Sequence, residues 1–209
     1  YGFVVNSYLK ALLCVILAAS PCASPAATNQ PACRDDQRVV SLAPNITEIV
    51  CAIGGAHHLV GRTSTCNFPP EAVKDVPVVG GFGTPSLERL LAVRPTLILD
   101  VALEDEALAR KMAEIGLRRE RIACKSLADI PSAITTVGAL IGHDSEAQTL
   151  AADLRAVIDA YAARARTVTN KPRVYVEIWC DPLFTAGKSS FVSELIALAG
   201  GANVGDVVD

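Results

Sequence analysis

The chain has 209 residues, of which 51% are hydrophobic and 20% are charged, and its net charge is −3. This length suits one large domain or two small ones, and the apolar content argues against general disorder. The slight acidic excess argues against a nucleic-acid-binding role, which usually requires a basic surface.

The first residues predict an export signal. Lys10 precedes an apolar run from Ala11 to Ala19, and small residues and prolines follow it. This order is typical of a secretory signal peptide, and the run is shorter than the ~20 residues that a membrane-spanning helix needs. We expect residues 1–27 to be a signal peptide, with cleavage after Ala26, that sends the chain to the periplasm or another extracytoplasmic compartment. A buried N-terminal helix is the alternative.

The cysteines define no pairing by themselves. The chain has 7 of them, an exported protein can oxidise them, and their scatter matches neither a disulfide framework nor a zinc-ligand cluster. Pro21 before Cys22 does not suit a lipid-attachment signal, and the sequence leaves a lipid anchor open. Pairing also stays open for the cysteines beyond the signal, which are Cys33, Cys51, Cys66, Cys124 and Cys180.

Alternating strands and helices are predicted over residues 38–142. The expected strands cover 38–44, 58–63, 96–101 and 121–126, the expected helices cover 45–55, 86–95, 104–116 and 129–142, and a proline-punctuated loop covers 68–77. This alternation is typical of βα units on a parallel sheet. We therefore expect a Rossmann-like N-terminal lobe over 38–142.

A long connecting helix is predicted over residues 143–168. Its apolar residues recur at three- and four-residue steps, and neither glycine nor proline interrupts it. At 1.5 Å per residue such a helix is on the order of 33 Å long. A new strand and helix follow over 171–209, so the expected fold class is α/β: two Rossmann-like βα lobes joined by one long helix, with the second lobe truncated at Asp209.

Ligands of parallel sheets bind beyond the carboxyl ends of the strands. The loops at Pro44–Asn45, Cys66–Pro70, Gly80–Thr84 and Asp100–Leu103 all follow strands, so we expect them to converge on one edge. Aromatic residues make up only 5% of the chain. Four of them fall in loops of this kind, where aromatic faces can bind a flat ligand: Phe68, Phe82, Trp179 and Phe184.

The segment "LFTAGKSS" at residues 183–190 contains Gly-Lys-Ser, the end of a phosphate-binding loop. A Walker A loop also needs a glycine five residues before Gly187, where this chain has Pro182. Proline lacks the backbone N–H that cradles phosphate, so we do not expect a nucleotide site here.

Four segments, in order and spacing, resemble a known family. They are "RVVSLAPNITEIVCAIG", "CNFPPEA", "SLERLLAVRPTLIL" and "VYVEIWCDPLFTAGKSSFVSELIALAGGANV". Together they resemble the substrate-binding proteins of ABC importers for cobalamin and iron–siderophore complexes, whose two lobes are joined by one long helix. The resemblance runs from about Arg38 to Val204. It implies a monomeric, non-enzymatic protein that binds a small metal chelate between its lobes and delivers it to an ABC permease.

The resemblance also assigns residue roles. It implies ligand binding by seven residues: Asn45, Cys66, Asn67, Phe68, Phe82, Trp179 and Phe184. It places Lys188 in a strand-to-helix turn, and it implies that Glu88 docks onto arginines of the permease. Each aromatic residue has a packing role as its alternative, and Glu88 has that of a solvated helix residue.

No resident cofactor or metal site is expected. His57 and His58 lie in a tight connection and His143 reads as the cap of the long helix, so we expect the 3 histidines not to converge. This argues against zinc or manganese cargo, which needs clustered ligands. An enzyme on a Rossmann-like sheet is a further alternative, but "SLAPNITE" lacks the glycine-rich turn, and Cys66 is the lone candidate nucleophile.

The cargo follows from the resemblance and from charge. Arg62 and Lys188 are the basic residues expected near the ligand, which is few for an anionic iron chelate. We therefore favour a corrinoid over a ferric siderophore, with haem or another metal chelate as the alternative.

Overall fold

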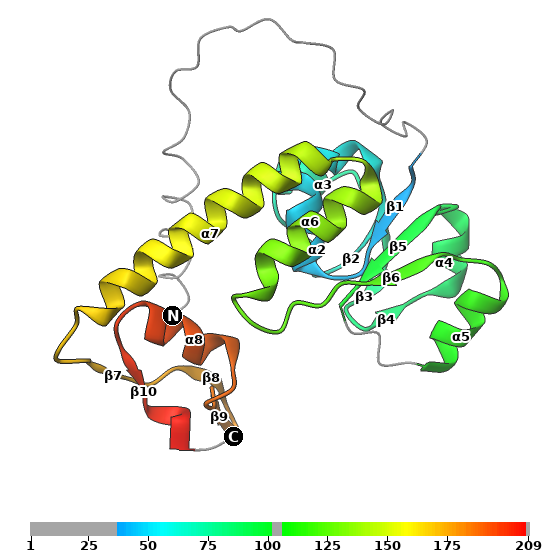
Figure 1. Ribbon diagram of the computed structural model, residues 1–209. Helices are drawn as coiled ribbons and strands as arrows, with labels where there is room; N and C mark the ends of the chain where they lie inside the picture. Colours follow the sequence, from blue (N-terminus) through cyan, green and yellow to red (C-terminus); the bar gives the residue numbers. More distant parts are fainter. Residues whose placement is uncertain (1–36, 102–105, 208–209) are drawn as a thin grey trace, which may run out of the picture. The chain divides into compact units, whose positions relative to one another are not determined.

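The computed structural model describes residues 37–101 and 106–207 (Figure 1). The predicted signal peptide, residues 1–27, lies outside them, as does Leu103 of the fourth predicted loop. Among the helices described, none is long and apolar enough to cross a membrane.

A six-stranded sheet forms the first part of the described chain. Its order is β4-β3-β2-β1-β5-β6, and all neighbouring strands are parallel except β3 and β4. The strands are β1 Val39–Ser41, β2 Leu59–Thr63, β3 Val78–Gly81, β4 Thr84–Pro85, β5 Leu97–Asp100 and β6 Arg119–Arg121. The helices between them are α2 Pro44–Ala52, η1 Gly55–His58, α3 Pro70–Val73, α4 Leu87–Ala92, α5 Glu106–Glu114 and α6 Asp129–Ile141.

The central strands β1 and β5 are buried on both faces. Successive side chains of a strand point to opposite faces, so each strand supplies two cores. Val39, Leu97 and Leu99 enter a core with α2, α6 and the start of the next helix. Val40 and Ile98 enter a second core with α4 and α5. Helices therefore cover both faces of the parallel sheet, as expected for the βα units that the alternation of strands and helices predicted.

Helix α7 spans Asp144–Arg166 and has 23 residues. It begins against α6, where small residues allow the two backbones to approach closely. A Cβ on Gly138 would lie only 2.2 Å from the Cβ of Ala147, and Ala147 and Ala151 are fully buried. At 1.5 Å per residue the helix is about 34 Å long.

A short βα segment follows α7. It contains β7 Arg173–Val174, β8 Glu177–Cys180, β9 Leu183–Thr185, α8 Phe191–Leu198, β10 Ala202–Asn203 and η2 Val204–Val207. β7 and β10 pair in parallel, and β8 and β9 form an antiparallel hairpin. The Asn203 side chain fastens the end of the segment, because its Nδ2 donates to Ala186 O at 2.8 Å and to Asp206 Oδ1 at 2.8 Å.

Three local predictions were wrong. The strand expected over 121–126 lies earlier, at β6, because Arg119 and Arg121 pair with the end of β5. The loop expected over 68–77 contains the short helix α3. The single new strand expected after residue 171 is divided into β7 and β8, and β8 pairs with β9.

Candidate ligand-binding surface

The carboxyl ends of the parallel strands form one edge of the six-stranded sheet, here called the carboxyl edge. From β1 the strand order runs through β2 and β3 in one direction and through β5 and β6 in the other. This makes the gap between β1 and β5 the topological switch point, where open α/β sheets bind ligands. The Leu42 backbone N–H donates to Leu99 O at 2.9 Å and closes the base of this gap.

Buried hydroxyl groups fix the turn after β1. Thr47 Oγ1 donates to Ser41 Oγ at 2.7 Å, and Ser41 Oγ donates to Ala43 O at 3.0 Å. Both side chains are fully buried, so these bonds hold the first turn of α2 against the strand. Asn45 lies in that turn, half-buried.

Arg62 supports the loop after β2 from within. Its Nε donates to Val73 O at 2.9 Å, and its Nη1 donates to Cys66 O at 3.0 Å. The guanidinium group therefore braces the loop from within. Asn67 and Phe68 are exposed on the same loop.

The prediction that Cys66 faces a ligand was wrong. Its side chain is fully buried, and its Sγ lies 3.0 Å from Thr63 Oγ1. The thiol packs beneath the loop and has no exposed surface with which to contact a ligand or attack a substrate. All four described cysteines, Cys51, Cys66, Cys124 and Cys180, have free thiols.

Phe82 lies at the tip of the turn between β3 and β4, with 51% of its surface exposed. The turn depends on glycine at position 80. Gly80 has a φ of +151°, and a Cβ there would lie 2.6 Å from Thr84 O. This close approach folds β4 back onto β3 and leaves the Phe82 ring projecting from the carboxyl edge.

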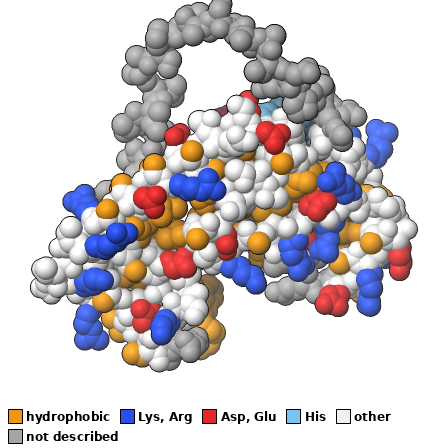
Figure 2. Space-filling view, in the orientation of Figure 1, with side chains coloured by type: hydrophobic (Ala, Val, Ile, Leu, Met, Phe, Trp, Pro, Cys, Tyr) orange, Lys and Arg blue, Asp and Glu red, His pale blue; other side chains and the backbone are white. Residues whose placement is uncertain are grey.

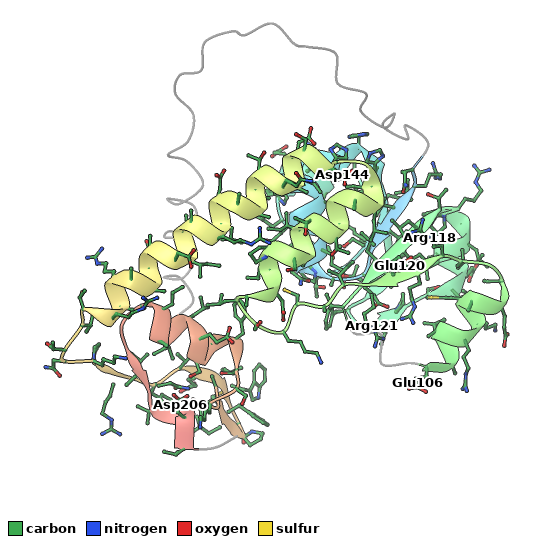
Figure 3. All side chains as sticks on the ribbon, viewed as in Figure 1. Glu106, Arg118, Glu120, Arg121, Asp144 and Asp206 are labelled. Atoms are coloured by element: carbon green, nitrogen blue, oxygen red, sulfur yellow. The ribbon has the colours of Figure 1, made fainter. Side chains whose placement is uncertain are left out.

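A charged cluster at β5 and β6 escaped the sequence analysis. Asp100 is buried at the end of β5, where Arg119 Nη1 lies 2.5 Å from its Oδ2 and Arg121 Nε lies 3.3 Å from its Oδ1. Arg121 ends β6 at the carboxyl edge with half of its side chain exposed (Figure 3). The alternation Arg-Glu-Arg was the available signal, because residues two apart in a strand share a face.

The β8–β9 hairpin exposes large apolar side chains. Trp179 and Phe184 pair directly in the register and are 62% and 56% exposed. Ile178 and Leu183 are equally exposed beside them. Figure 2 shows hydrophobic side chains along the edge of the segment that carries this hairpin. The Trp179 Nε1–H donates to Asp181 O at 2.8 Å, which fixes the indole ring.

The Gly-Lys-Ser stretch lies in the turn between β9 and α8, the strand-to-helix turn where the resemblance placed Lys188. Ser190 Oγ accepts a hydrogen bond from Ser193 N at 3.1 Å and caps α8, while Ser190 N donates to Gly187 O. Lys188 is exposed in the turn before the helix. Glu88, assigned to permease docking, is exposed in the first turn of α4.

The expectation that the histidines do not converge was wrong. The ligand atoms of His57, His58 and His143 all lie within 4.8 Å of one another. His143 does stand at the N-cap position of α7, but its side chain makes no capping hydrogen bond.

The chain combines a parallel sheet covered on both faces, a 23-residue helix and a further βα segment with an aromatic hairpin. These features define the class of α/β binding proteins whose two lobes are joined by one helix. The chain belongs to the periplasmic binding protein family, whose model matches residues 39–207. This confirms the family resemblance and the fold class.

Curated relatives carry the name vitamin B12-binding protein. The one from Pectobacterium atrosepticum is 30% identical over 173 residues, and the match covers 80% of this chain and 62% of that protein. A substrate-binding lipoprotein of an ABC transporter from Bacillus subtilis is 25% identical, and the match covers 78% of this chain and 54% of that protein. The chain thus spans less than two thirds of these relatives.

Solved structures show the same fold. The periplasmic heme-binding protein RhuT from Roseiflexus sp. RS-1, in its apo form, matches with a TM-score of 0.72 and 33% identity, over 80% of this chain and 65% of that one. The periplasmic vitamin B12-binding protein BtuF of Vibrio cholerae matches with a TM-score of 0.71 and 25% identity, over 83% of this chain and 68% of that one.

Proposed function

We propose that this chain is part of an extracytoplasmic solute-binding protein, without catalytic activity, that captures a corrinoid and delivers it to an ABC importer. The observation that carries the proposal is the exposure of three aromatic rings: Phe82 at 51% on the β3–β4 turn, and Trp179 at 62% and Phe184 at 56% on the strands of the β8–β9 hairpin, where the sequence had placed loops. Large rings held open by a fixed backbone mark a binding surface, because covering the exposed part of each ring removes from water about half of the ~150–250 Å² that an aromatic side chain can bury. The vitamin B12-binding relatives supply the cargo class.

Haem is the second candidate cargo, because the heme-binding RhuT is 33% identical to this chain. An iron porphyrin and a corrinoid are both flat macrocycles that aromatic rings can cover. They differ in the side chains that the binding site must supply, since haem binding usually includes a side-chain ligand to the iron. Tyr175, 47% exposed beside β8, is the described residue that could serve.

Calorimetric titration of the full-length protein with cyanocobalamin, a ferric hydroxamate and hemin tests the cargo. We expect cyanocobalamin to bind, and Trp179→Ala or Phe82→Ala to weaken that binding by roughly 10-fold or more, because each removes an aromatic contact. Tyr161→Ala is the matched control, since Tyr161 is 42% exposed on α7, away from the strand ends. Binding of hemin alone, lost in Tyr175→Phe, would replace the corrinoid by haem.

Docking to the permease is tested separately at Glu88. We propose that its carboxylate meets basic residues of the permease, so Glu88→Gln should slow ligand-stimulated ATP hydrolysis by a reconstituted importer without changing ligand affinity. Glu71→Gln is the control, because Glu71 is also exposed on a short helix and pairs only with Lys74. Equal stimulation by both variants would remove Glu88 from the docking surface.

A further inference from the structure

The three histidines of the chain meet at the opposite end of β2 from the ligand-binding surface. His57 and His58 end η1 and directly precede β2, whereas His143 stands between α6 and α7. The turn that brings them together needs two glycines. Gly54 has a φ of +83°, which favours glycine, and a Cβ on Gly55 would lie 2.5 Å from Ile141 Cδ1, so η1 packs closely against the end of α6.

The separation of the two inner rings is compatible with a shared metal ion. Nε2 of His58 and Nε2 of His143 are 3.4 Å apart in a hydrogen bond that is longer than the ~2.7–3.2 Å usual for an N–H donor. Two nitrogens of a tetrahedral zinc site lie about 3.3 Å apart, since each Zn–N bond is about 2.0–2.1 Å. The third ring, His57, lies with its centroid 3.9 Å from that of His58 and 5.8 Å from that of His143.

Burial arranges the three rings as a site open on one side. His58 is 1% exposed, His143 is half-buried and His57 is exposed. A buried imidazole is held in place, while the exposed one can rotate to complete the ligand set. In Figure 2 the histidine colour gathers at one spot near the start of α7.

The surrounding charges also permit a cation. The carbonyl end of α6 lies two residues before His143 in the chain, and helix carbonyl ends favour positive charge. The opposing N-terminus of α7 carries Asp144 and Glu146 in its first turn, which offset its partial positive charge (Figure 3).

We propose that His57, His58 and His143 bind a divalent ion of the zinc type, which clamps the start of α7 to the sheet. Imidazole is a preferred ligand of zinc, copper and nickel. Three protein ligands are enough for a tetrahedral zinc site when water takes the fourth position. The proposal is independent of the cargo, because these residues lie at the amino end of β2 rather than at the carboxyl edge.

Zinc titration of the full chain, followed by ¹⁵N-edited NMR of the imidazoles, tests the site directly. The chain has only 3 histidines, so every ring is observed. We expect one equivalent of Zn²⁺, added in the presence of a non-thiol reductant, to shift all three spin systems together. Shifts confined to the exposed His57, or shifts in none, would overturn the proposal. Because the rings themselves are observed, zinc binding to cysteine is distinguished in the same spectra.

Variants then test each ligand. His57→Ala and His143→Gln should each lower zinc affinity by roughly 100-fold or more, since even the partners that only orient a ligand are worth about 10–100-fold. Asp153→Asn is the control and should leave the affinity within about twofold, because Asp153 is exposed on α7 more than two helical turns beyond His143 and outside the cluster. Since His58 is buried, its replacement is not needed, and the wild-type spectra report on it. Unchanged affinity in His143→Gln would also overturn the site.

Discussion

The junction between α6 and α7 depends on a glycine, and Gly138→Ala should destabilise the protein. A Cβ at position 138 would lie 2.2 Å from the Cβ of Ala147 and 2.9 Å from His143 O. Carbon atoms pack at about 3.5–4.0 Å, so the helices would have to move apart by roughly 1 Å or more. One obstacle is backbone, which no rotamer change can relieve.

The size of the effect follows from two opposing contributions. Alanine in place of glycine stabilises a helix interior by up to about 1 kcal/mol. Overpacking of a well-packed core costs about 1–3 kcal/mol, and here two helices and a carbonyl are displaced. We expect a net loss near 2 kcal/mol in the free energy of unfolding, which lowers Tm by about 4–8 °C at this chain length.

A double-mutant cycle in urea measures whether the contact is the cause. Ala147→Gly removes the methyl group that the new Cβ meets, so Gly138→Ala with Ala147→Gly should be more stable than the sum of the single effects by about 1 kcal/mol. Strict additivity, or a Gly138→Ala protein as stable as the wild type, would refute the argument that backbone approach sets the helix spacing.

Three further predictions concern polar contacts. Two backbone amides hold the pKa of Asp129 below its usual value. The contribution of Asp129 to the free energy of unfolding is therefore complete above pH about 3.9 and is lost as the pH falls through the lowered pKa. In a pH series of urea titrations, Asp129→Asn should reduce the loss of stability at acid pH. Asp100→Asn leaves the partly exposed Arg119 without its buried carboxylate partner. This should lower the free energy of unfolding by about 2 kcal/mol, less than the about 3–5 kcal/mol for breaking a fully buried pair. A thermal unfolding curve unchanged from that of the wild type would contradict this. Ser190→Ala should cost about 1 kcal/mol by removing the cap of α8, with the adjacent exposed Ser189→Ala as control and chemical denaturation as the assay.

The layout of the N-terminal lobe was predictable because its signals are local. β1 and β5 read as continuous apolar runs, and each lies buried between two helical layers. Ser86 begins the helix predicted over 86–95, and in the structure its side chain caps α4. Such features depend on a few neighbouring residues, so periodicity and capping rules find them.

Features that depend on distant residues were missed. Asp100 pairs with arginines of a strand that the sequence placed several residues too late. His143 meets His58 across 85 positions, and only the fit of Gly55 against α6 brings them together. Cys66 lies in a loop, yet it is buried because Arg62 draws that loop inward. Spacing along the chain shows that Arg119 and Arg121 share a face of a strand, but it does not show which distant residue any of these groups meets.

Strand β2 links the two proposed sites, and its geometry predicts that they act independently. His58 directly precedes the strand and Arg62 braces the loop after it, so the sites are separated by roughly 15 Å of extended chain at about 3.3 Å per residue. Coupling between sites requires an element with two arrangements that both ligands distinguish. β2 is hydrogen-bonded on both sides and its inward residues are buried, which favours one arrangement. Saturating Zn²⁺ should therefore change the dissociation constant for cyanocobalamin by less than about twofold in paired titrations. A tenfold change would mean that β2 shifts on metal binding, and the histidine cluster would then be a control element of ligand capture rather than a clamp.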